Sequence, residues 1–171
     1  SAREAIDALG AHALARPILV DLTAGETAGL LQAALARGFD LALANKRPLT
    51  GSQAEYEALH RAAAERGRRI RFEATVGAGL PIIDTFDKLV EAGDRVQRIE
   101  GCPSGTLGFL FGQLGLGRPF SKALADAIAR GYTEPDPRDD LSGTDVARKA
   151  LIVGRMLGFK GELAQVAAES L

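Results

Sequence analysis

Short, mostly apolar runs alternate with segments of helical periodicity over the first part of the chain. Residues 15–23, 39–44 and 70–75 form the apolar runs, which are typical of strands buried inside a parallel sheet. Between them, residues 26–37 and 51–67 have apolar positions three and four apart, which indicates helices. This order predicts a parallel sheet covered by helices, with right-handed crossovers.

Helical patterns dominate the rest of the chain. Residues 81–91 begin with a proline, which suits the first turn of a helix. Further helices are predicted at residues 104–116, 121–131 and 140–157, and the partial alternation of residues 96–100 predicts one short strand.

These patterns place the chain in the α/β class. Residues 1–76 resemble the latter part of a Rossmann-like domain with a parallel sheet, and residues 77–171 are expected to form a second domain, because the sheet pattern ends there and helices take over. The glycine-rich turn that follows the first strand of a dinucleotide-binding domain is absent from the sequence. The segment GAGLP at 77–81 lacks the third glycine of that fingerprint. We therefore expect a partial dinucleotide-binding domain without its pyrophosphate loop.

Composition narrows the possible partners. The chain has 171 residues, 46% hydrophobic and 25% charged, with a formal net charge of -1, which indicates a soluble globular protein and argues against a nucleic-acid partner. No apolar run approaches the ~20 residues that span a bilayer, and the start SAREAIDALG lacks a signal-peptide pattern, so we expect a cytoplasmic protein without membrane contact. A single cysteine, Cys102, and two histidines argue against a disulfide and a soft-ligand metal centre.

The stretch GYTEPDPRDDLSGTDVARK, residues 131–149, combines five acidic and three basic residues with two prolines. Ser142 and Asp145 have the spacing of a capping box, and Asp145 and Lys149 lie one helical turn apart. A solvent-exposed pair of this kind is worth only ~0.2–0.5 kcal/mol. A partly desolvated lysine among carboxylates would instead carry protons or bind polar substrate groups, and both interpretations stay open at this point. The loop carboxylates are those of Glu134, Asp136, Asp139 and Asp140.

Four motifs in order resemble one enzyme family. They are the stretch just described, ANKRPL at 44–49, EATVGAGLPII at 73–83 and SGTLGFLFGQL at 104–114. Together they closely resemble homoserine dehydrogenase, most of all the form fused behind an aspartate kinase, and the similarity runs from Leu19 to Gly158. The resemblance implies an enzyme that interconverts L-homoserine and L-aspartate 4-semialdehyde with NADP or NAD, and hence a small amino-acid substrate.

The resemblance also implies roles for single residues. Lys149 and Lys46 match the two lysines at the reacting hydroxyl, Lys149 being the first choice for proton transfer, and Asp145 matches a carboxylate that supports the catalytic lysine. Glu134 and Asp140 match carboxylates that bind the substrate amino group. These residue types suit the chemistry, because an ammonium near the hydroxyl stabilises a developing alkoxide and exchanges a proton with water.

Other matches concern the substrate pocket and the cofactor. Thr106 and Tyr132 match substrate-pocket positions, Tyr132 through its backbone. Thr23 matches a residue near the nicotinamide ribose, and Lys46 also matches a cofactor-binding position. The sequence leaves the choice between NAD and NADP open, because the loop that accepts the ribose lies outside the chain.

The segment EATVGAGLPII suggests a cation site. In the family that it resembles, main-chain carbonyls matching Glu73, Val76, Ala78 and Leu80 hold a monovalent cation, sodium or potassium, and carbonyl oxygens are ligands that hard cations prefer. The alternative is an interdomain hinge whose glycines only permit tight packing.

The resemblance implies that residues 77–171 are part of an α+β domain for catalysis or dimerisation and that this domain is incomplete. Compared with the family, the chain is expected to lack both ends, because it starts after the place of the glycine-rich loop and stops before the remaining sheet of the catalytic domain. Two classes of function follow. One is a portion of a dehydrogenase, expected to form a homodimer or a higher homo-oligomer. The other is a non-catalytic dimerisation or regulatory module that retains the fold, whose open sheet edge and apolar surface would need covering.

Overall fold

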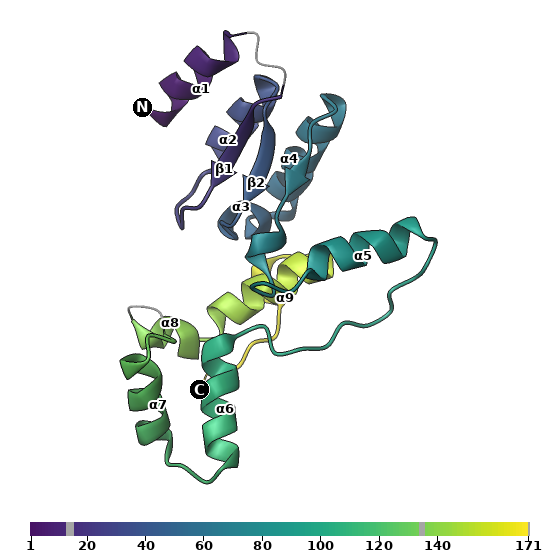
Figure 1. Cartoon of the computed structure of the whole chain (residues 1–171). Coiled ribbons are helices and arrows are strands. Elements are labelled where there is room, and N and C mark those ends of the chain that lie inside the picture. The colour runs from purple at the N-terminus through teal and green to yellow at the C-terminus, as the bar shows by residue number, and fades with distance from the viewer. Residues whose placement is uncertain (13–15, 134–135, 171) are drawn as a thin grey trace.

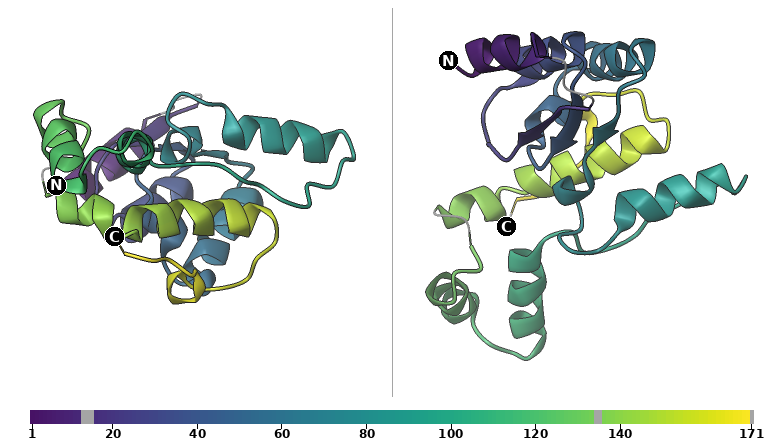
Figure 2. Two further views of the ribbon diagram at one scale, coloured as in Figure 1. Left: turned by 90° about the horizontal axis from the view of Figure 1, so that it is seen from below. Right: turned by 45° about the horizontal axis from the view of Figure 1, so that its top comes forward.

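The computed structural model describes residues 1–12, 16–133 and 136–170. A small parallel sheet with its helices forms one part of the molecule, and a group of helices forms the other (Figure 1). The helix α9 (Thr144–Met156) lies between the two parts, as the further views in Figure 2 also show.

The sheet contains three parallel strands, as the sequence predicted, and they lie in the order β1-β2-β3. They are β1 (Ile18–Asp21), β2 (Asp40–Leu43) and β3 (Ile70–Arg71). Ile18 pairs with Asp40, and Leu41 pairs with Ile70. The parallel register puts the carboxyl ends of β1 and β2 at one edge of the sheet, where α/β proteins bind their ligands.

Two of the predicted strands are too long. The predicted first strand, 15–23, begins at Ile18, and residues 13–15 lie outside the described part of the chain. The predicted third strand, 70–75, ends at Arg71, and Glu73–Thr75 forms the 3-10 helix η1. The turn is closed by Thr75, whose hydroxyl and amide both donate to the carbonyl of Phe72, at 2.7 and 3.0 Å.

The two crossover helices agree with the prediction to within about two residues, which is the usual uncertainty of helix ends. They are α2 (Ala28–Ala36) and α4 (Gln53–Glu65). Ser52 and Glu55 form a capping box at the start of α4, and Gly67, with a φ of 60°, follows its end. The helices α1 (Ala2–Gly10) and α3 (Arg47–Thr50) were not predicted.

Two groups of buried side chains hold the molecule together. The first lies between the sheet and its helices and also takes in Ile83 and Ile152, so α9 packs against the first part of the chain. Its largest members are Leu31, Leu35, Leu41, Leu43, Phe39, Leu49 and Leu59. The second, smaller group joins α6 (Gly105–Gly115) to α7 (Phe120–Ala129) through Leu110, Ala123 and Ala127.

Helix α5 (Ile82–Glu91) projects away from the rest of the molecule, and the chain returns from it to α6 without regular structure (Figure 1). The short strand predicted at 96–100 is therefore wrong. The alternating pattern is present, but a strand needs a neighbour for its backbone groups. Within the described residues, the sheet consists of β1, β2 and β3 alone.

The helix predicted at 140–157 is in fact two helices. Helix α8 (Pro137–Leu141) ends before Gly143, which has a φ of 73° and precedes α9. This position needs glycine, because a Cβ there would lie 3.1 Å from the carbonyl oxygen of Glu169 and in a conformation that L-residues avoid. The predicted capping box is also wrong: the Ser142 hydroxyl oxygen accepts from the Thr144 amide at 3.2 Å.

No helix in the described part of the chain is long and apolar enough to cross a membrane.

Candidate active site

Lys46 and Lys149 meet on one carboxylate. Asp145 lies in the first turn of α9, and its Oδ2 is 2.6 Å from Lys149 Nζ, one turn further along the helix. Its Oδ1 is 3.1 Å from Nζ of Lys46, the residue that precedes α3. The pair predicted from the spacing of Asp145 and Lys149 is therefore present, and the fold adds a second lysine to it.

This cluster is partly shielded from water. The side chain of Lys149 is 17% exposed, that of Lys46 is 28% exposed and that of Asp145 is 40% exposed. Burial raises the pKa of Asp145, but contacts with Lys149 and Lys46 lower it, and the pKa lies below its ordinary value. The carboxylate is thus ionised at neutral pH, and one negative charge faces two ammonium groups.

Lys149 reaches a second element of the structure. Its Nζ donates to the carbonyl of Pro103 at 2.8 Å, directly before the start of α6. An ammonium has three N–H donors, of which Asp145 and Pro103 use two. Among the residues that the structure describes, Nζ has these two partners.

A second polar cluster is built on the first turn of α6. The buried hydroxyl of Thr106 lies 2.7 Å from the carbonyl oxygen of Tyr132 and 2.9 Å from Oδ1 of Asp140, on α8. The Tyr132 side chain is instead half exposed and packs on Phe109, with ring centroids 5.1 Å apart. Tyr132 thus contributes its backbone carbonyl to this cluster.

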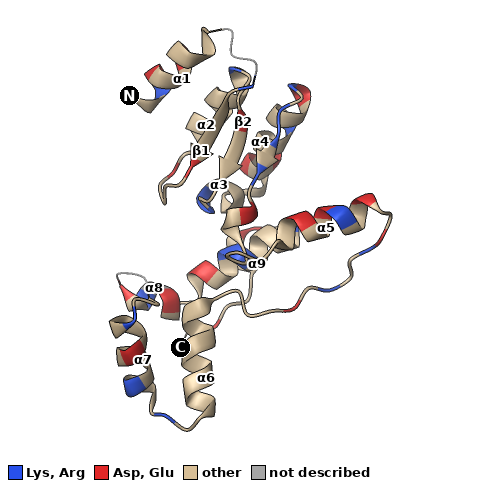
Figure 3. Ribbon diagram, viewed as in Figure 1, with Lys and Arg blue, Asp and Glu red and all other residues tan. Residues whose placement is uncertain are grey.

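The two clusters converge on the N-terminal end of α6. Pro103, which binds Lys149, and Thr106, which binds Asp140, stand on either side of Ser104, the residue that caps α6 by accepting from the Leu107 amide at 3.1 Å. Helix α6 itself carries no charged residue (Figure 3), so the charged groups that meet at its N-terminal end, Asp140 and Lys149, come from α8 and α9. Glu134, also expected here, lies outside the described residues.

Sequence reasoning missed a buried network at the carboxyl ends of β1 and β2. Asp21 is 5% exposed and accepts hydrogen bonds from Thr23 Oγ1 at 2.8 Å, Thr27 Oγ1 at 2.6 Å and Asn45 Nδ2 at 3.1 Å. Asn45 Oδ1 also accepts from the Arg47 amide at 3.1 Å, so the residues on both sides of Lys46 are held. Polar residues ending two adjacent parallel strands were a visible signal for this network.

The Asp21 carboxylate is stabilised in its charged form. Burial raises its pKa, but the hydrogen bonds from Thr27, Thr23 and Asn45 lower it, and the pKa lies below its ordinary value of 3.8. Thr23, matched to the nicotinamide ribose, is therefore fixed by Asp21 through both its hydroxyl and its amide, at 2.8 and 3.0 Å.

The segment with the expected cation ligands is a tight turn. Gly77 and Ala78 have positive φ values of 86° and 51°. The Gly77 carbonyl accepts from the Leu80 amide, and the Leu80 carbonyl accepts from the Ile82 amide, both at 2.9 Å. Glu73 uses its side chain to cap α5, accepting from the amides of Ile83 and Asp84 at 2.9 and 2.8 Å, so only its main-chain carbonyl would serve a cation.

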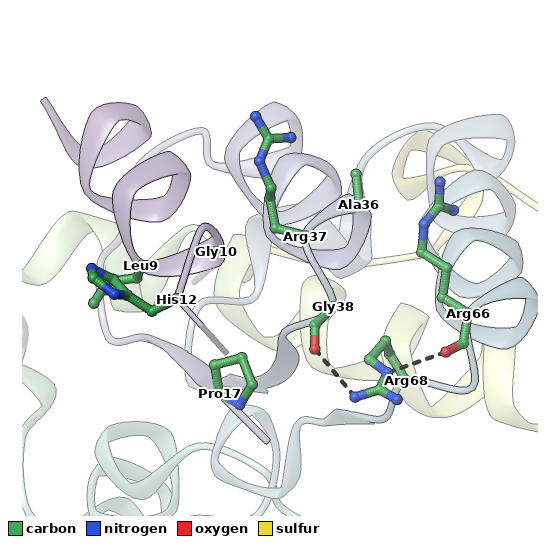
Figure 4. A pocket seen from close by; sticks show the side chains of 9 residues that line it. All are labelled: Leu9, Gly10, His12, Pro17, Ala36, Arg37, Gly38, Arg66 and Arg68. Carbon is green, nitrogen blue, oxygen red and sulfur yellow. Dashed lines mark hydrogen bonds between the residues drawn. The ribbon is translucent and has the colours of Figure 1, made fainter. Parts of the chain in front are cut away.

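A hollow of about 620 Å³ lies elsewhere, at the amino-terminal edge of the strands. It is lined by the ends of α1, α2 and α4, and Arg68 there donates to the carbonyls of Gly38 and Arg66 at 3.2 and 3.1 Å (Figure 4). Arg37, also in its wall, forms an ion pair with Asp7 at 2.7 Å. These arginines neutralise helix C-termini and a carboxylate, and the site described above is at the opposite edge of the sheet.

The parallel sheet, its crossover helices and the polar edge at its carboxyl ends define an α/β protein of the dinucleotide-binding class. Residues 2–73 match the family model described as homoserine dehydrogenase, NAD binding domain, and residues 81–171 match that described as homoserine dehydrogenase. The chain belongs to the homoserine dehydrogenase family.

Individual relatives with similar sequences are also named as homoserine dehydrogenases. The chain is 43% identical over 161 residues to the bifunctional aspartokinase/homoserine dehydrogenase of Haemophilus influenzae, covering 94% of this chain and 20% of that protein. It is 43% identical over 154 residues to homoserine dehydrogenase of Schizosaccharomyces pombe, covering 86% of this chain and 41% of that protein. The chain thus spans less than half the length of these relatives.

Solved structures share the fold. Homoserine dehydrogenase from Thermoplasma acidophilum has a TM-score of 0.73 and 29% identity, covering 92% of this chain and 50% of that one. A hyperthermophilic archaeal homoserine dehydrogenase in complex with NADPH has a TM-score of 0.77 and 28% identity, covering 91% of this chain and 46% of that one.

Proposed function

We propose that the chain is part of a homoserine dehydrogenase that interconverts L-homoserine and L-aspartate 4-semialdehyde with NADP or NAD. The observation that carries this proposal is the meeting of Lys46 and Lys149 on Asp145, brought together by two separate elements. A lysine pair on one carboxylate, next to a polar cluster around Thr106, gives a small polar substrate both a proton donor and a binding group.

The substrate is bound by groups of opposite charge. Asp140, together with Glu134, binds the amino group of the substrate. Thr106 orients Asp140 by its hydrogen bond, and the Tyr132 carbonyl is a further acceptor beside them. An amino acid held in this way directs its other end toward the lysines, because both clusters meet at the start of α6.

Lys149 transfers the proton. In the reducing direction, the aldehyde oxygen of the substrate takes a proton from the Lys149 ammonium, and the resulting amine is reprotonated from water. In the oxidising direction, the hydroxyl proton leaves by the same route. Lys46 stabilises negative charge that develops on the same oxygen, and Asp145 keeps both ammonium groups in place.

The residues present suit the nicotinamide end of a cofactor. When bound, NADP or NAD accepts or supplies the hydride at the substrate carbon. Thr23 and Lys46 would hold it, since both stand at the carboxyl ends of the strands and are fixed by the Asp21 and Asn45 network. The sequence of the chain has no glycine-rich pyrophosphate loop, so the rest of that binding site has to come from elsewhere in the protein.

A monovalent cation, sodium or potassium, is proposed to bind the main-chain carbonyls of Glu73, Val76, Ala78 and Leu80. The tight turn at Gly77 and Ala78 supports this proposal, since consecutive positive φ values fold the segment back on itself. The Leu80 carbonyl already accepts one hydrogen bond and has a second lone pair for a cation. The effect expected of the cation is to hold the turn in place, and its test is argued in the Discussion.

The protein is further proposed to be a homodimer or a higher homo-oligomer. Apolar side chains on and near α5 support this, with exposed fractions of 65% for Leu80, 48% for Val90 and 41% for Ile99. The division into domains 1–76 and 77–171 and the cytoplasmic location remain predictions. Plant relatives are described as chloroplastic. The alternative of a non-catalytic dimerisation or regulatory module is less well supported, because such a module has no physical need for two lysines on one carboxylate.

The test is homoserine-dependent reduction of NADP and NAD by the full-length gene product and its Lys149→Ala variant. We expect kcat to fall by about 10²–10⁴-fold in the variant, with little change in folding. Lys122→Ala is the matched control, because Lys122 is exposed on α7, away from both clusters, and turnover should stay unchanged. A folded wild type without activity would refute the dehydrogenase proposal, and an active Lys149→Ala variant would refute the role of Lys149.

A further inference from the structure

Arg155 is buried in the contact between the two parts of the molecule. Its side chain is 0% exposed, which is rare for arginine unless the charge is satisfied. Nη1 donates to the carbonyl of Leu49 at 2.7 Å, and Nη2 donates to the carbonyls of Gly51 and Gly161 at 2.8 and 3.0 Å. Glu162 lies 3.9 Å from Nη2. The guanidinium therefore binds the end of α3 and the segment that follows α9.

Helix α3 depends on these contacts. It is a single turn, and an isolated turn of helix is unstable because nucleation costs more than one hydrogen bond returns. The carbonyls at a helix end lack partners inside the helix, and Arg155 supplies donors to Leu49 and to Gly51, the residue after α3. Lys46, at the other end, is the residue that precedes α3.

Helix α9 thus holds α3 at both ends. Near the start of α9, Asp145 contacts Lys46, and near its end Arg155 contacts Leu49 and Gly51. The Lys46 contact is partly exposed to water, so by itself it is weak. The Arg155 side chain is buried and makes two charge-assisted hydrogen bonds to the main-chain carbonyls of Leu49 and Gly51, so this contact is the stronger of the two.

We propose that Arg155 is a positioning residue for Lys46: by binding the carbonyls of Leu49 and Gly51 it fixes α3 along α9 and keeps Lys46 on Asp145. The effect of Arg155 on turnover rests on the proposed dehydrogenase function, whereas its effect on the position of Lys46 does not. Arg155 does not reach the candidate site itself. Among the described residues, its partners are the three carbonyls, Glu162 and the ring of Tyr56, 4.8 Å from the guanidinium carbon.

The first test measures the exposure of the Lys46 amine without requiring activity. The full-length protein and its Arg155→Lys variant are treated with a limiting amine-labelling reagent, and modification at Lys46 is quantified by mass spectrometry relative to the exposed Lys122. Lysine cannot reproduce the fork of an arginine, so α3 loosens. We expect labelling of Lys46 to rise about two- to fivefold, the range that corresponds to losing a partly exposed ion pair.

Two further variants control this experiment. Arg118→Lys alters an arginine that pairs with Asp126 at 2.8 Å in the α6 and α7 region, and it should leave Lys46 labelling unchanged. Glu162→Gln removes the charge beside Arg155 but keeps a side-chain oxygen that can accept from the Gln53 amide, as Glu162 Oε1 does at 2.9 Å, so the rise should be smaller than in Arg155→Lys. It also gives a readout if Arg155→Lys does not fold. If Arg155→Lys folds, unchanged labelling of Lys46 in this variant would overturn the proposal. If it does not fold, unchanged labelling of Lys46 in Glu162→Gln would overturn it.

The second test asks whether Arg155 acts on turnover through Lys46. Arg155→Lys should lower kcat by about tenfold to a hundredfold when Lys46 is present, as expected for a misplaced catalytic group. In a Lys46→Met background, the same change should alter kcat less than about twofold, because coupled residues do not add. Equal losses in both backgrounds would mean a general structural role and would overturn the proposal. An inactive wild type would refute the proposed function instead and leave the labelling result to decide.

Discussion

Lys46 and Lys149 are bound to the two oxygens of a single carboxylate, Asp145, at 3.1 and 2.6 Å. Two ammonium groups this close would repel one another without the negative charge between them. The carboxylate therefore sets the spacing of the two lysines as well as their orientation. Because Lys46 follows β2 and Lys149 lies on α9, the same contact also joins the two parts of the molecule.

Asp145→Asn should separate the two lysines while preserving the shape of the side chain. The amide has no charge to offset their repulsion, so we expect kcat to fall by about a hundredfold, as for other misplaced reacting groups. Steady-state kinetics with homoserine would measure this in the full-length protein. Asp126→Asn, which removes a carboxylate from the ion pair with Arg118, is the matched control and should leave kcat unchanged. Full activity in Asp145→Asn would show that the lysines do not need the carboxylate.

Asp21→Asn should lower stability in a pH-dependent way. The folded pKa of Asp21 lies below its ordinary value of 3.8. The Asp21 carboxylate therefore contributes to the free energy of unfolding at pH values above 3.8, and this contribution is lost as the pH falls through the folded pKa. We expect the variant to lose about 1.5–3 kcal/mol in free energy of unfolding near pH 7, the range for hydrogen bonds to a charged group. Urea unfolding from pH 3 to pH 7 would measure the difference between the two proteins, which should shrink toward acid.

Asp87 provides a control for this pH series, because its pKa is shifted in the opposite direction to that of Asp21. Burial raises the pKa of Asp87, Arg71 lowers it and nearby carboxylates raise it, so its folded pKa lies above its ordinary value of 3.8. A carboxyl group with a raised pKa makes a contribution to the free energy of unfolding that is present at low pH and is lost as the pH rises through the folded pKa. The difference between wild type and Asp87→Asn should therefore change with pH in the opposite sense. The same trend in both variants would contradict the assignment for Asp21.

The sequence was sufficient for features that depend on local pattern. The alternation of apolar runs with helical periodicity predicted that β1, β2 and β3 form a parallel sheet, because a buried strand and an amphipathic helix each have their own repeat. The Asp145 and Lys149 pair followed from one turn of helix. Family resemblance then suggested Lys46 and Asp140 as site residues, but it did not give their contacts.

Features that depend on tertiary contacts were not predictable in this way. Gly143, with a φ of 73°, separates α8 from α9 within the helix expected at 140–157, and the carbonyl of Glu169 approaches it too closely for a side chain, which no local pattern reports. Residues 96–100 alternate like a strand but have no pairing strand in the described part of the chain. The burial of Arg155 depends on carbonyls of α3, which come from a distant part of the sequence.

Thr106→Val should weaken substrate binding more than turnover. The variant keeps the shape of the side chain but removes the hydroxyl that contacts both the Tyr132 carbonyl and Asp140. We expect a loss of about 1–3 kcal/mol in stability, the cost of removing a buried hydrogen-bond donor from its acceptors. The KM for homoserine should rise about tenfold, because Asp140 loses the hydrogen bond from Thr106 that helps to orient it. Thr106→Ser retains the hydroxyl and should behave like wild type, whereas equal effects in Ser and Val variants would point to packing alone.

Gly77→Ala should disrupt the turn that carries the proposed cation ligands. With a φ of 86°, an added Cβ would lie 2.3 Å from Cδ1 of Ile82, so both backbone strain and a clash oppose alanine. We expect a loss of at least about 1–2 kcal/mol in stability from the left-handed conformation alone. Gly79→Ala is the matched control, because a Cβ there meets nothing within 4 Å, and its stability should change by less than about 0.5 kcal/mol.

The same pair of variants tests the cation. The melting temperature of the full-length protein should be higher in sodium or potassium chloride than in tetramethylammonium chloride at equal ionic strength, since a ligand that binds the folded state stabilises it. This difference should persist in Gly79→Ala and vanish in Gly77→Ala, because only the latter moves the carbonyls of Ala78 and Leu80. Equal melting temperatures in all three salts would leave the turn with the role of a tightly packed hinge, as the alternative interpretation of its glycines holds.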